Sequence, residues 1–249
     1  MGGASQGIGR ATAQVLAEAG ARVVLLARRQ DVLEQVRSEL PQSKEHRTLA
    51  LDLERVEDVS THVSRLVAEL GSIPIWVNNT GGPKAGPLAE ASPDEMERAF
   101  RGHVLASQVI LRALLPGMKS QKYGRIVNVL STSVKIPIPN LGVSNTIRAA
   151  MSAWSKTLAQ ELGPHGITIN CILPGYTETP RLEALAVGQS QKQGKTSEQI
   201  KLEWSESVPL RRLGQPEETA RAIAFLLSEH ANYISGVHLP VDGGRTGAF

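Results

Sequence analysis

Apolar positions form two kinds of pattern that alternate along the whole chain. The run RVVLLA at 22–27 is continuous and rich in branched residues, which is typical of a strand buried on both faces. At 56–70, by contrast, Val59, Val63 and Val67 recur at helical spacing among polar residues and predict an amphipathic helix. This alternation predicts parallel strands joined by crossover helices, which is an α/β fold.

The same two patterns divide the rest of the chain. Strands are predicted at 22–27, 48–51, 73–77, 125–130, 168–173 and 237–241, and helices at 7–19, 30–40, 56–70, 93–115, 145–162 and 216–227. Ser92 caps the fourth helix, Glu95 completes a capping box, and we expect that helix to end near Pro116. We therefore expect one domain, 1–249, with a three-layer, doubly wound parallel sheet of the Rossmann type. Its polar segment 176–212 is predicted to form an irregular, flexible lid with helical pieces over a ligand.

The chain begins at a glycine-rich turn, whereas in a dinucleotide-binding fold a strand leads into that turn. That strand is central, so its loss would expose ladder groups on two neighbouring strands. We expect the first strand to be missing from this chain, and of the two explanations, a start codon placed too late or a fold without the element, we favour the first.

Composition narrows the class of ligand. The 249 residues are 41% hydrophobic, and the scattered Lys and Arg that give a net charge of +3 favour an anionic small molecule over nucleic acid. Cys171 is the only cysteine, which excludes a disulfide and a thiolate cluster, and the histidines lack metal-ligand spacing, so we predict no metal site. Without an apolar run of roughly 20 residues or a signal peptide, a cytoplasmic protein without membrane contact is expected.

A glycine-rich turn precedes the first predicted helix. Glycines at such a turn let the backbone approach a pyrophosphate, and the helix N-terminus offers free N–H groups and a positive dipole end. The alternative is an ordinary glycine-rich turn, but the helix and the strand follow at the expected interval. We therefore predict that a dinucleotide contacts the residues of this turn, which are Gly3, Ser5, Gln6, Gly7, Ile8 and Gly9.

Two arginines indicate which dinucleotide binds, NAD(H) or NADP(H). Arg28 and Arg29 follow the strand at 22–27, and Ala27 occupies the place where an acidic residue would bind a ribose 2′-hydroxyl. Cations at this place accommodate a 2′-phosphate. The alternative is a pair of solvated arginines at a helix start. The pattern favours NADP(H) as the cofactor.

With further motifs in view, the chain resembles the short-chain dehydrogenase/reductase family, and within it the 3-oxoacyl-[acyl-carrier-protein] reductase-like branch. The resemblance spans nearly the whole chain and is carried by the turn at 3–9, Asp52-Leu53, Asn78-Asn79-Thr80-Gly81, GRIVN at 124–128, Pro174-Gly175, RLGQPEE at 212–218 and VDGG at 241–244. It implies further cofactor contacts from Asp52, Leu53, Asn79, Gly81, Arg148, Pro174 and Gly175.

The resemblance also implies a catalytic tetrad, which this chain alters. Ser131 matches the family's serine, but the tyrosine and lysine of its Tyr-x-x-x-Lys pair are replaced by Ser144 and Arg148, and its asparagine by His103. A serine hydroxyl is less acidic and shorter than a phenol. Arg148 presents a fork of donors and is able to stabilise an alkoxide, but with a pKa above about 12 it is no acid at neutral pH.

Other side chains are candidates for the missing proton donor. His103 has a suitable intrinsic pKa of about 6.5, and we hypothesise that it supplies the proton directly or through a water held by Ser131 or Ser144. The alternative is that His103 is an ordinary helical histidine whose ring nitrogens hydrogen-bond to backbone groups. Tyr176, at the start of the lid, is a candidate to replace the missing phenol. Lys135 is expected to face solvent or an anionic substrate tail.

The resemblance therefore favours an NADP(H)-dependent oxidoreductase that reduces a small ketone or a 3-oxoacyl thioester. One alternative is a catalytically degenerate dinucleotide-binding sensor or partner subunit. Another is non-redox chemistry on the same fold, against which the retained nucleotide motifs speak. The helices at 103–115 and 145–162 are apolar over more than one face, and relatives pair these helices, so a homodimer or homotetramer is expected.

Overall fold

Short parallel strands form the centre of the protein in the computed structural model, which describes residues 1–42 and 45–247. The strands are β1 (Val24–Ala27), β2 (Arg47–Ala50), β3 (Ile75–Asn78), β4 (Gly124–Val129), β5 (Ile167–Pro174) and β6 (His238–Val241). β1 pairs with β2, while the other four pair in the order β3-β4-β5-β6. All pairings are parallel, as the buried runs predicted, and in the longest ladder Gly124 lies opposite Ile167.

Met1 and Gly2 lie where the expected first strand would run. The Leu26 N–H donates to the Met1 carbonyl at 2.9 Å, and the Gly2 N–H donates to the Val77 carbonyl at 3.0 Å. Gly2 also forms a parallel bridge with Leu26. These two residues thus lie between β1 and β3 and join the two groups of strands. They close part of the ladder that a missing strand would leave open.

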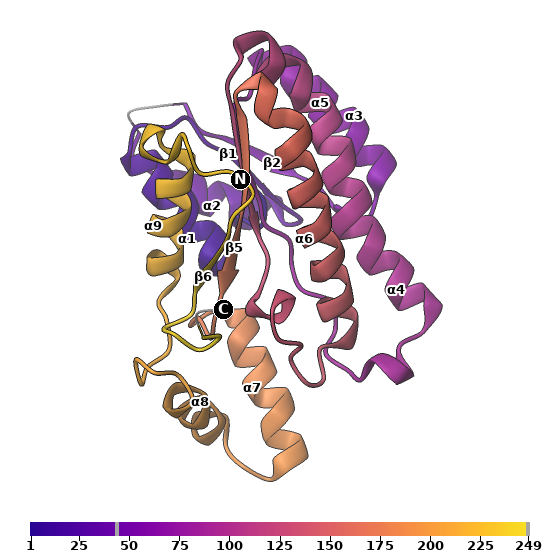
Figure 1. Cartoon of the computed structure of the whole chain (residues 1–249), viewed down its shortest axis with the longest axis vertical. Coiled ribbons are helices and arrows are strands. Elements are labelled where there is room, and N and C mark those ends of the chain that lie inside the picture. Colours follow the sequence, from indigo (N-terminus) through magenta and orange to yellow (C-terminus); the bar gives the residue numbers. More distant parts are fainter. Residues whose placement is uncertain (43–44, 248–249) are drawn as a thin grey trace.

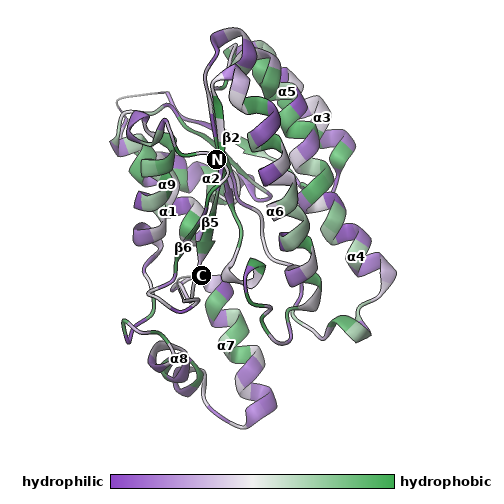
Figure 2. Ribbon diagram, viewed as in Figure 1, coloured by the Kyte–Doolittle hydropathy of each residue, from purple (hydrophilic) through white to green (hydrophobic). Residues whose placement is uncertain are grey.

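Helices cover both faces of the sheet (Figure 1). They are α1 (Gly7–Glu18), α2 (Gln30–Glu39), α3 (Val56–Leu70), α4 (Pro93–Phe100), α5 (Ala106–Gln121), α6 (Gly142–Leu162), α7 (Pro180–Gln193), α8 (Ser197–Glu206) and α9 (Pro216–Leu227). α1, α2 and α9 lie on one side of the strands, α3 to α6 lie on the other, and α7 and α8 extend beyond the strand ends. In Figure 2 the helices carry hydrophilic and hydrophobic residues side by side, whereas β5 is mostly hydrophobic. The three layers are those that the α/β pattern predicts.

One predicted helix differs from the structure. The helix expected to end near Pro116 continues to Gln121, with the proline inside it. Leu114 and Met118, exposed by only 4% and 0%, pack into the core on either side of Pro116. Their burial outweighs the one backbone hydrogen bond that a proline removes.

The helical pieces predicted within the segment 176–212 are the two helices α7 and α8, each with a threonine cap.

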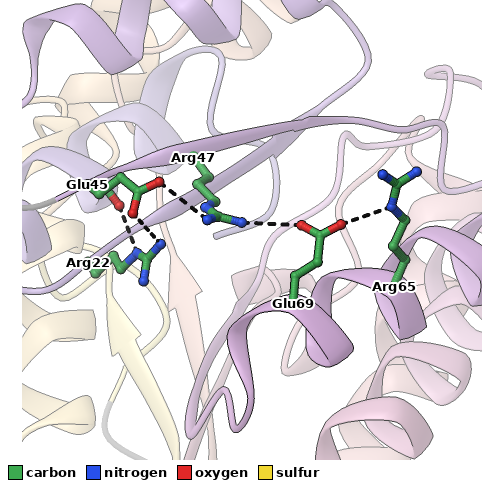
Figure 3. A network of polar contacts seen from close by, with 5 residues as sticks. All are labelled: Arg22, Glu45, Arg47, Arg65 and Glu69. Atoms are coloured by element: carbon green, nitrogen blue, oxygen red, sulfur yellow. Dashed lines mark hydrogen bonds and ion pairs between the residues drawn. The ribbon is translucent and has the colours of Figure 1, made fainter.

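A chain of ion pairs connects the start of β1, the start of β2 and α3 on the surface (Figure 3). Glu45 pairs with Arg22 at 2.8 Å and with Arg47 at 3.3 Å. Glu69 in α3 pairs with Arg47 at 3.2 Å and with Arg65 at 2.9 Å. These side chains are exposed, so the pairs contribute little to stability. Arg65 therefore serves below as a control position.

Candidate active site

A cleft of ≈ 1300 Å³ opens at the carboxyl ends of the strands. Doubly wound sheets bind their ligands at this edge. The cleft is lined by nearly all the residues that sequence analysis assigned to a site, which are Gly3, Ser5, Gln6, Gly7, Ile8, Arg28, Arg29, Asp52, Leu53, Asn79, Gly81, His103, Ser131, Ser144, Arg148, Pro174 and Gly175. The structure thus brings predicted residues from strand ends far apart in the chain into one cleft.

The nucleotide end of the cleft is built around the start of α1. Gln6 precedes the helix without a side-chain cap, and the first turn has no acidic residue. Its N–H groups and the positive end of its dipole are therefore available to an anion. Gly3 has φ 59°, and a Cβ there would lie 2.6 Å from Asn79 Nδ2. This tight, uncapped turn fits a pyrophosphate.

Gly9 does not line the cleft, in contrast to its assignment as a cofactor contact. It is buried in the first turn of α1, and a Cβ there would lie 2.0 Å from the Gly3 carbonyl oxygen and 2.9 Å from Asn79 Nδ2. Because no side chain fits that space, Gly9 lets the turn pack against the helix. Gly9 thus shapes the site, and its contact with the cofactor stays a prediction.

The adenosine end of the cleft carries unpaired positive charge. Arg28 and Arg29 are exposed and line the cleft, and neither forms an ion pair in the part of the chain that the structure describes. Asp52 and Leu53 line the same cleft after β2. Two unpaired guanidinium groups at this end fit a ribose 2′-phosphate.

A buried hydrogen-bond network holds the strand ends that surround the catalytic positions. Asn78 Nδ2, at the end of β3, donates to Asn128 Oδ1 in β4 at 2.7 Å and to Ser107 Oγ in α5 at 2.8 Å. Asn128 Nδ2 in turn donates to Ser155 Oγ in α6 at 2.9 Å. The network joins two strands to both neighbouring helices, so it fixes the positions from which the residues below enter the cleft.

Ser131, Ser144 and Arg148 meet the cleft beyond β4. Arg148 Nε donates to Ser144 Oγ at 3.3 Å, and its Nη1 donates to the carbonyls of Val129 and Leu130 at 3.1 and 2.7 Å. Ser131 Oγ accepts from the Ser133 N–H at 3.1 Å. Both serine oxygens thus accept a hydrogen bond, which leaves each hydroxyl proton free for a substrate oxygen. Burial, and then the charge of Arg181, lower the pKa of Arg148 to about 10, so it stays cationic at neutral pH.

His103 is neutral at physiological pH, which removes the reason for choosing it as an acid. It lies in a π-helical turn at Arg101–Leu105, is only 7% exposed, and its Nδ1 is 2.6 Å from Thr80 Oγ1. Burial, and then the Arg148 charge, lower its pKa from 6.5 to about 3, against a smaller opposing effect of the Gly81 backbone. A neutral imidazole is a poor proton donor, so the hypothesis that His103 supplies the proton is not supported by its surroundings.

His103 should instead make the fold sensitive to acid. Because its pKa is lower in the folded than in the unfolded chain, the unfolded state binds more protons between pH 6.5 and 3, and stability falls as the pH drops through that range. Relative to His103→Asn, the protein should lose about 2 kcal/mol more unfolding free energy between pH 7 and pH 5. Urea titrations of both proteins check this, since other titrating groups cancel, and equal losses would contradict it.

Tyr176 enters the cleft beside an arginine from the C-terminal segment. Its Oη accepts from Arg245 Nη2 at 3.2 Å, its ring stacks on Trp204 with centroids 5.0 Å apart, and the Arg245 guanidinium lies 4.4 Å above the same ring. Arg245 Nη1 also donates to Thr132 Oγ1 at 3.2 Å. The phenol is therefore connected through one guanidinium to the residue after Ser131.

Several cleft residues were not found by sequence analysis. They include Thr80, Arg181, Trp204 and Arg245. Thr80 lay inside a quoted motif, so its neighbourhood gave a signal, whereas Arg181, Trp204 and Arg245 belong to no pattern that indicates a site. Lys135, by contrast, is exposed and does not line the cleft.

Comparison with known proteins shows to which family the chain belongs. The model of a protein family described as Enoyl-(Acyl carrier protein) reductase matches residues 3–246. The chain belongs to this short-chain dehydrogenase/reductase family. The match confirms the resemblance drawn from the motifs.

Three members show how close the relation is. The NADPH-dependent reductase BacG of Bacillus subtilis (strain 168) is 28% identical over 97% of this chain and 95% of its own. The 3-oxoacyl-[acyl-carrier-protein] reductase FabG of Vibrio harveyi is 33% identical over 97% and 94%. The crystal structure of L-sorbose reductase from Gluconobacter frateurii, complexed with NADPH and L-sorbose, has a TM-score of 0.92 at 31% identity and covers 100% of this chain and 96% of that one. The chain thus shares its whole length with oxidoreductases. In the described residues, no helix is long and apolar enough to cross a membrane.

Proposed function

We propose that this protein is an NADP(H)-dependent oxidoreductase that reduces the carbonyl of a small ketone or a 3-oxoacyl thioester. The observation that carries the proposal is the single cleft in which a complete nucleotide end meets Ser131 and the cation Arg148. Relatives named as an NADPH-dependent reductase and as a 3-oxoacyl-[acyl-carrier-protein] reductase support it.

The residues of the nucleotide end fit NADP(H). The uncapped start of α1 would hold the pyrophosphate, Arg28 and Arg29 the 2′-phosphate, and Asp52 with Leu53 the adenine. Asn79, Gly81, Pro174 and Gly175 line the path from there toward Ser131. When bound, the cofactor supplies the hydride that reduces the carbonyl carbon.

The altered tetrad is proposed to bind the substrate oxygen. Ser131 and Ser144 donate hydrogen bonds from their free hydroxyls to the carbonyl oxygen without transferring the protons, and the fixed charge of Arg148 stabilises the negative charge that develops there. Arg148 is held by Val129 and Leu130, so its charge needs no rearrangement during the reaction. These three groups are proposed to orient the substrate carbonyl in place of the family's Tyr-x-x-x-Lys pair.

Tyr176 is proposed as the acid that gives the oxygen its proton. Its oxygen accepts from Arg245, so its own proton points elsewhere and is free for a substrate oxygen. In Tyr176→Phe, kcat should fall about 100-fold while NADPH affinity changes less than about threefold, because the ring that stacks on Trp204 stays. Steady-state kinetics check this against Tyr233→Phe, a fully exposed phenol that should have no effect. Unchanged turnover in Tyr176→Phe would exclude the assignment.

A second candidate function is a dinucleotide-binding sensor or partner subunit without turnover. It is favoured by the replacement of the family's tyrosine and lysine by Ser144 and Arg148. It needs the same nucleotide end, so cofactor binding alone does not separate the two functions. Turnover does.

A fluorescence titration with NADPH and with NADH tests the proposal first. NADPH should bind at least about tenfold more tightly than NADH, and replacing Arg28 and Arg29 by alanine should remove the difference by weakening NADPH alone. A screen of ketones and acyl thioesters with NADPH then follows. Binding without turnover of any carbonyl compound would favour the sensor, and failure to bind either cofactor would exclude both functions.

We also propose a homodimer or homotetramer that pairs α5 and α6 of neighbouring chains. Phe100, the last residue of α4, and Leu105, just before α5, are exposed by 41% and 37%, which leaves apolar surface near the start of α5. Light scattering on the purified protein should give the mass of two or four chains. The mass of one chain would contradict the proposal.

A further inference from the structure

Beyond Arg28 and Arg29, the cleft is strongly basic. Its further cationic lining residues are Lys84, Arg98, Arg148, Arg181, Lys192 and Arg245. In the part of the chain that the structure describes, the carboxylates that line the cleft are Asp52, Glu54 and Glu95, and Glu95 accepts from the Ser92 N–H at 3.0 Å in a capping box. Clefts in which one sign of charge dominates concentrate ligands of the opposite sign. The cleft therefore attracts anions.

Arg181 is fixed in the cleft by the loop after β3. It lies in the first turn of α7, and its Nη2 donates to the Pro83 carbonyl at 2.6 Å. The guanidinium lies against Gly82, where a Cβ would be 3.2 Å from Nη2 and 3.3 Å from Nε. Pro83 thus occupies only Nη2, and no carboxylate of the described residues lies within ion-pair distance. Nε and Nη1 make no hydrogen bond among the described residues, so each is free to donate to an anionic oxygen.

Arg148 stands near enough to Arg181 for their charges to interact. The repulsion contributes to the lowered pKa of Arg148, and burial lowers the pKa of Arg181 as well. Two partly buried like charges without a counter-charge are unfavourable, and an anion bound beside them relieves the repulsion. Both guanidinium groups are held by backbone carbonyls, so they keep this arrangement without the anion.

We propose that Arg181 binds an anionic oxygen group of the substrate, so that the carbonyl compound reduced in this cleft is an oxo acid. The inference rests on the proposed function and adds its substrate class. The cofactor pyrophosphate also carries anionic oxygens that Arg181 is able to bind. Thr179, which precedes α7, lies beside the glycine-rich turn, since a Cβ on Gly7 would be 3.0 Å from Thr179 Cγ2. The experiment below separates the two sources.

Matched pairs of acid and ester test the proposal with the full chain and NADPH. Pyruvate, acetoacetate and levulinate are compared with their methyl esters in wild type, Arg181→Gln, Arg181→Lys and the surface control Arg65→Gln. At least one acid should be preferred over its ester, and Arg181→Gln should lower kcat/KM for that acid about 30-fold, mainly through KM, while the ester changes less than about threefold. Arg181→Lys should recover part of the loss, and Arg65→Gln should match wild type.

Two kinetic outcomes would overturn the inference. One is an equal loss for acid and ester in Arg181→Gln. The other is a loss of NADPH affinity by the same factor as the acid, which would assign Arg181 to the pyrophosphate.

A binding measurement keeps this inference separate from the proposed reductase activity. Malonate, an unreactive dicarboxylate, should bind the NADPH-loaded protein in calorimetry, and Arg181→Gln should weaken it at least about tenfold. If no carbonyl compound is turned over but malonate binding depends on Arg181, the anion site stands and the reductase activity fails. If malonate does not bind, or binds Arg181→Gln equally well, the inference is overturned.

Discussion

Replacing Arg148 by glutamine should lower kcat by about 100- to 1000-fold, the range expected when a charged donor to a developing oxyanion is removed. Arg148 Nη1 donates to the Val129 and Leu130 carbonyls, and its Nε donates to Ser144 Oγ. The variant therefore loses both the charge in the cleft and the donor that orients Ser144. NADPH affinity should change less than about tenfold, because the proposed phosphate contacts are the start of α1 and the pair Arg28 and Arg29. Single-turnover kinetics at saturating NADPH separate the chemical step from binding.

Arg148→Lys is the matched control for charge. A lysine keeps the positive charge but lacks the planar fork that reaches two carbonyls and Ser144, so about a tenfold loss of kcat is expected. A melting curve for each variant shows whether the fold survives. Turnover in Arg148→Gln equal to wild type, with the fold intact, would exclude Arg148 from the reaction.

Gly9→Ala should abolish NADPH binding although Gly9 does not line the cleft. The added Cβ would lie 2.0 Å from the Gly3 carbonyl oxygen, so the glycine-rich turn has to move away from α1. The displacement should cost about 3 kcal/mol of unfolding free energy and weaken NADPH at least about 100-fold, because the N–H groups no longer converge on one anion. Denaturant titration and fluorescence titration measure the two effects.

Gly163→Ala is the control for this substitution. Apart from its chain neighbours, no heavy atom lies within 4 Å of a Cβ at Gly163, and its φ is −50°, which any residue adopts. It should leave stability and NADPH affinity near wild type. If Gly9→Ala also does so, close packing between the turn and α1 is not what shapes the nucleotide end.

The sequence alone determined the architecture and the nucleotide end. The helices at 56–70 and 216–227 have the predicted bounds, since helical spacing and a capping Gln215-Pro216 start depend on residues a few positions apart. The glycine-rich turn was recognised for the same reason. A strand that is buried on both faces has a continuous apolar sequence, and such runs predicted the parallel strands.

Pro116 marks the limit of such local reasoning. A proline predicts a helix end because it removes a backbone hydrogen bond, and here the helix continues to Gln121. Burial of Leu114 and Met118 in the core decides the outcome, and that core includes Trp76 and Ile126 from distant strands. No window around Pro116 contains this information.

Only the tertiary structure decided the chemistry of the substrate end. From the sequence alone, an ordinary histidine pKa is expected for His103. Burial and the charge of Arg148, 45 residues later, lower that pKa to about 3. Arg181 and Arg245 belong to no recognisable motif, and they become cleft residues because α7 and the C-terminal segment fold over the ends of β4 and β5. Desolvation and charge interactions act through space between residues far apart in the chain, whereas periodicity, caps and turns act between neighbours, so the sequence determined the fold and the tertiary structure determined the site's charges.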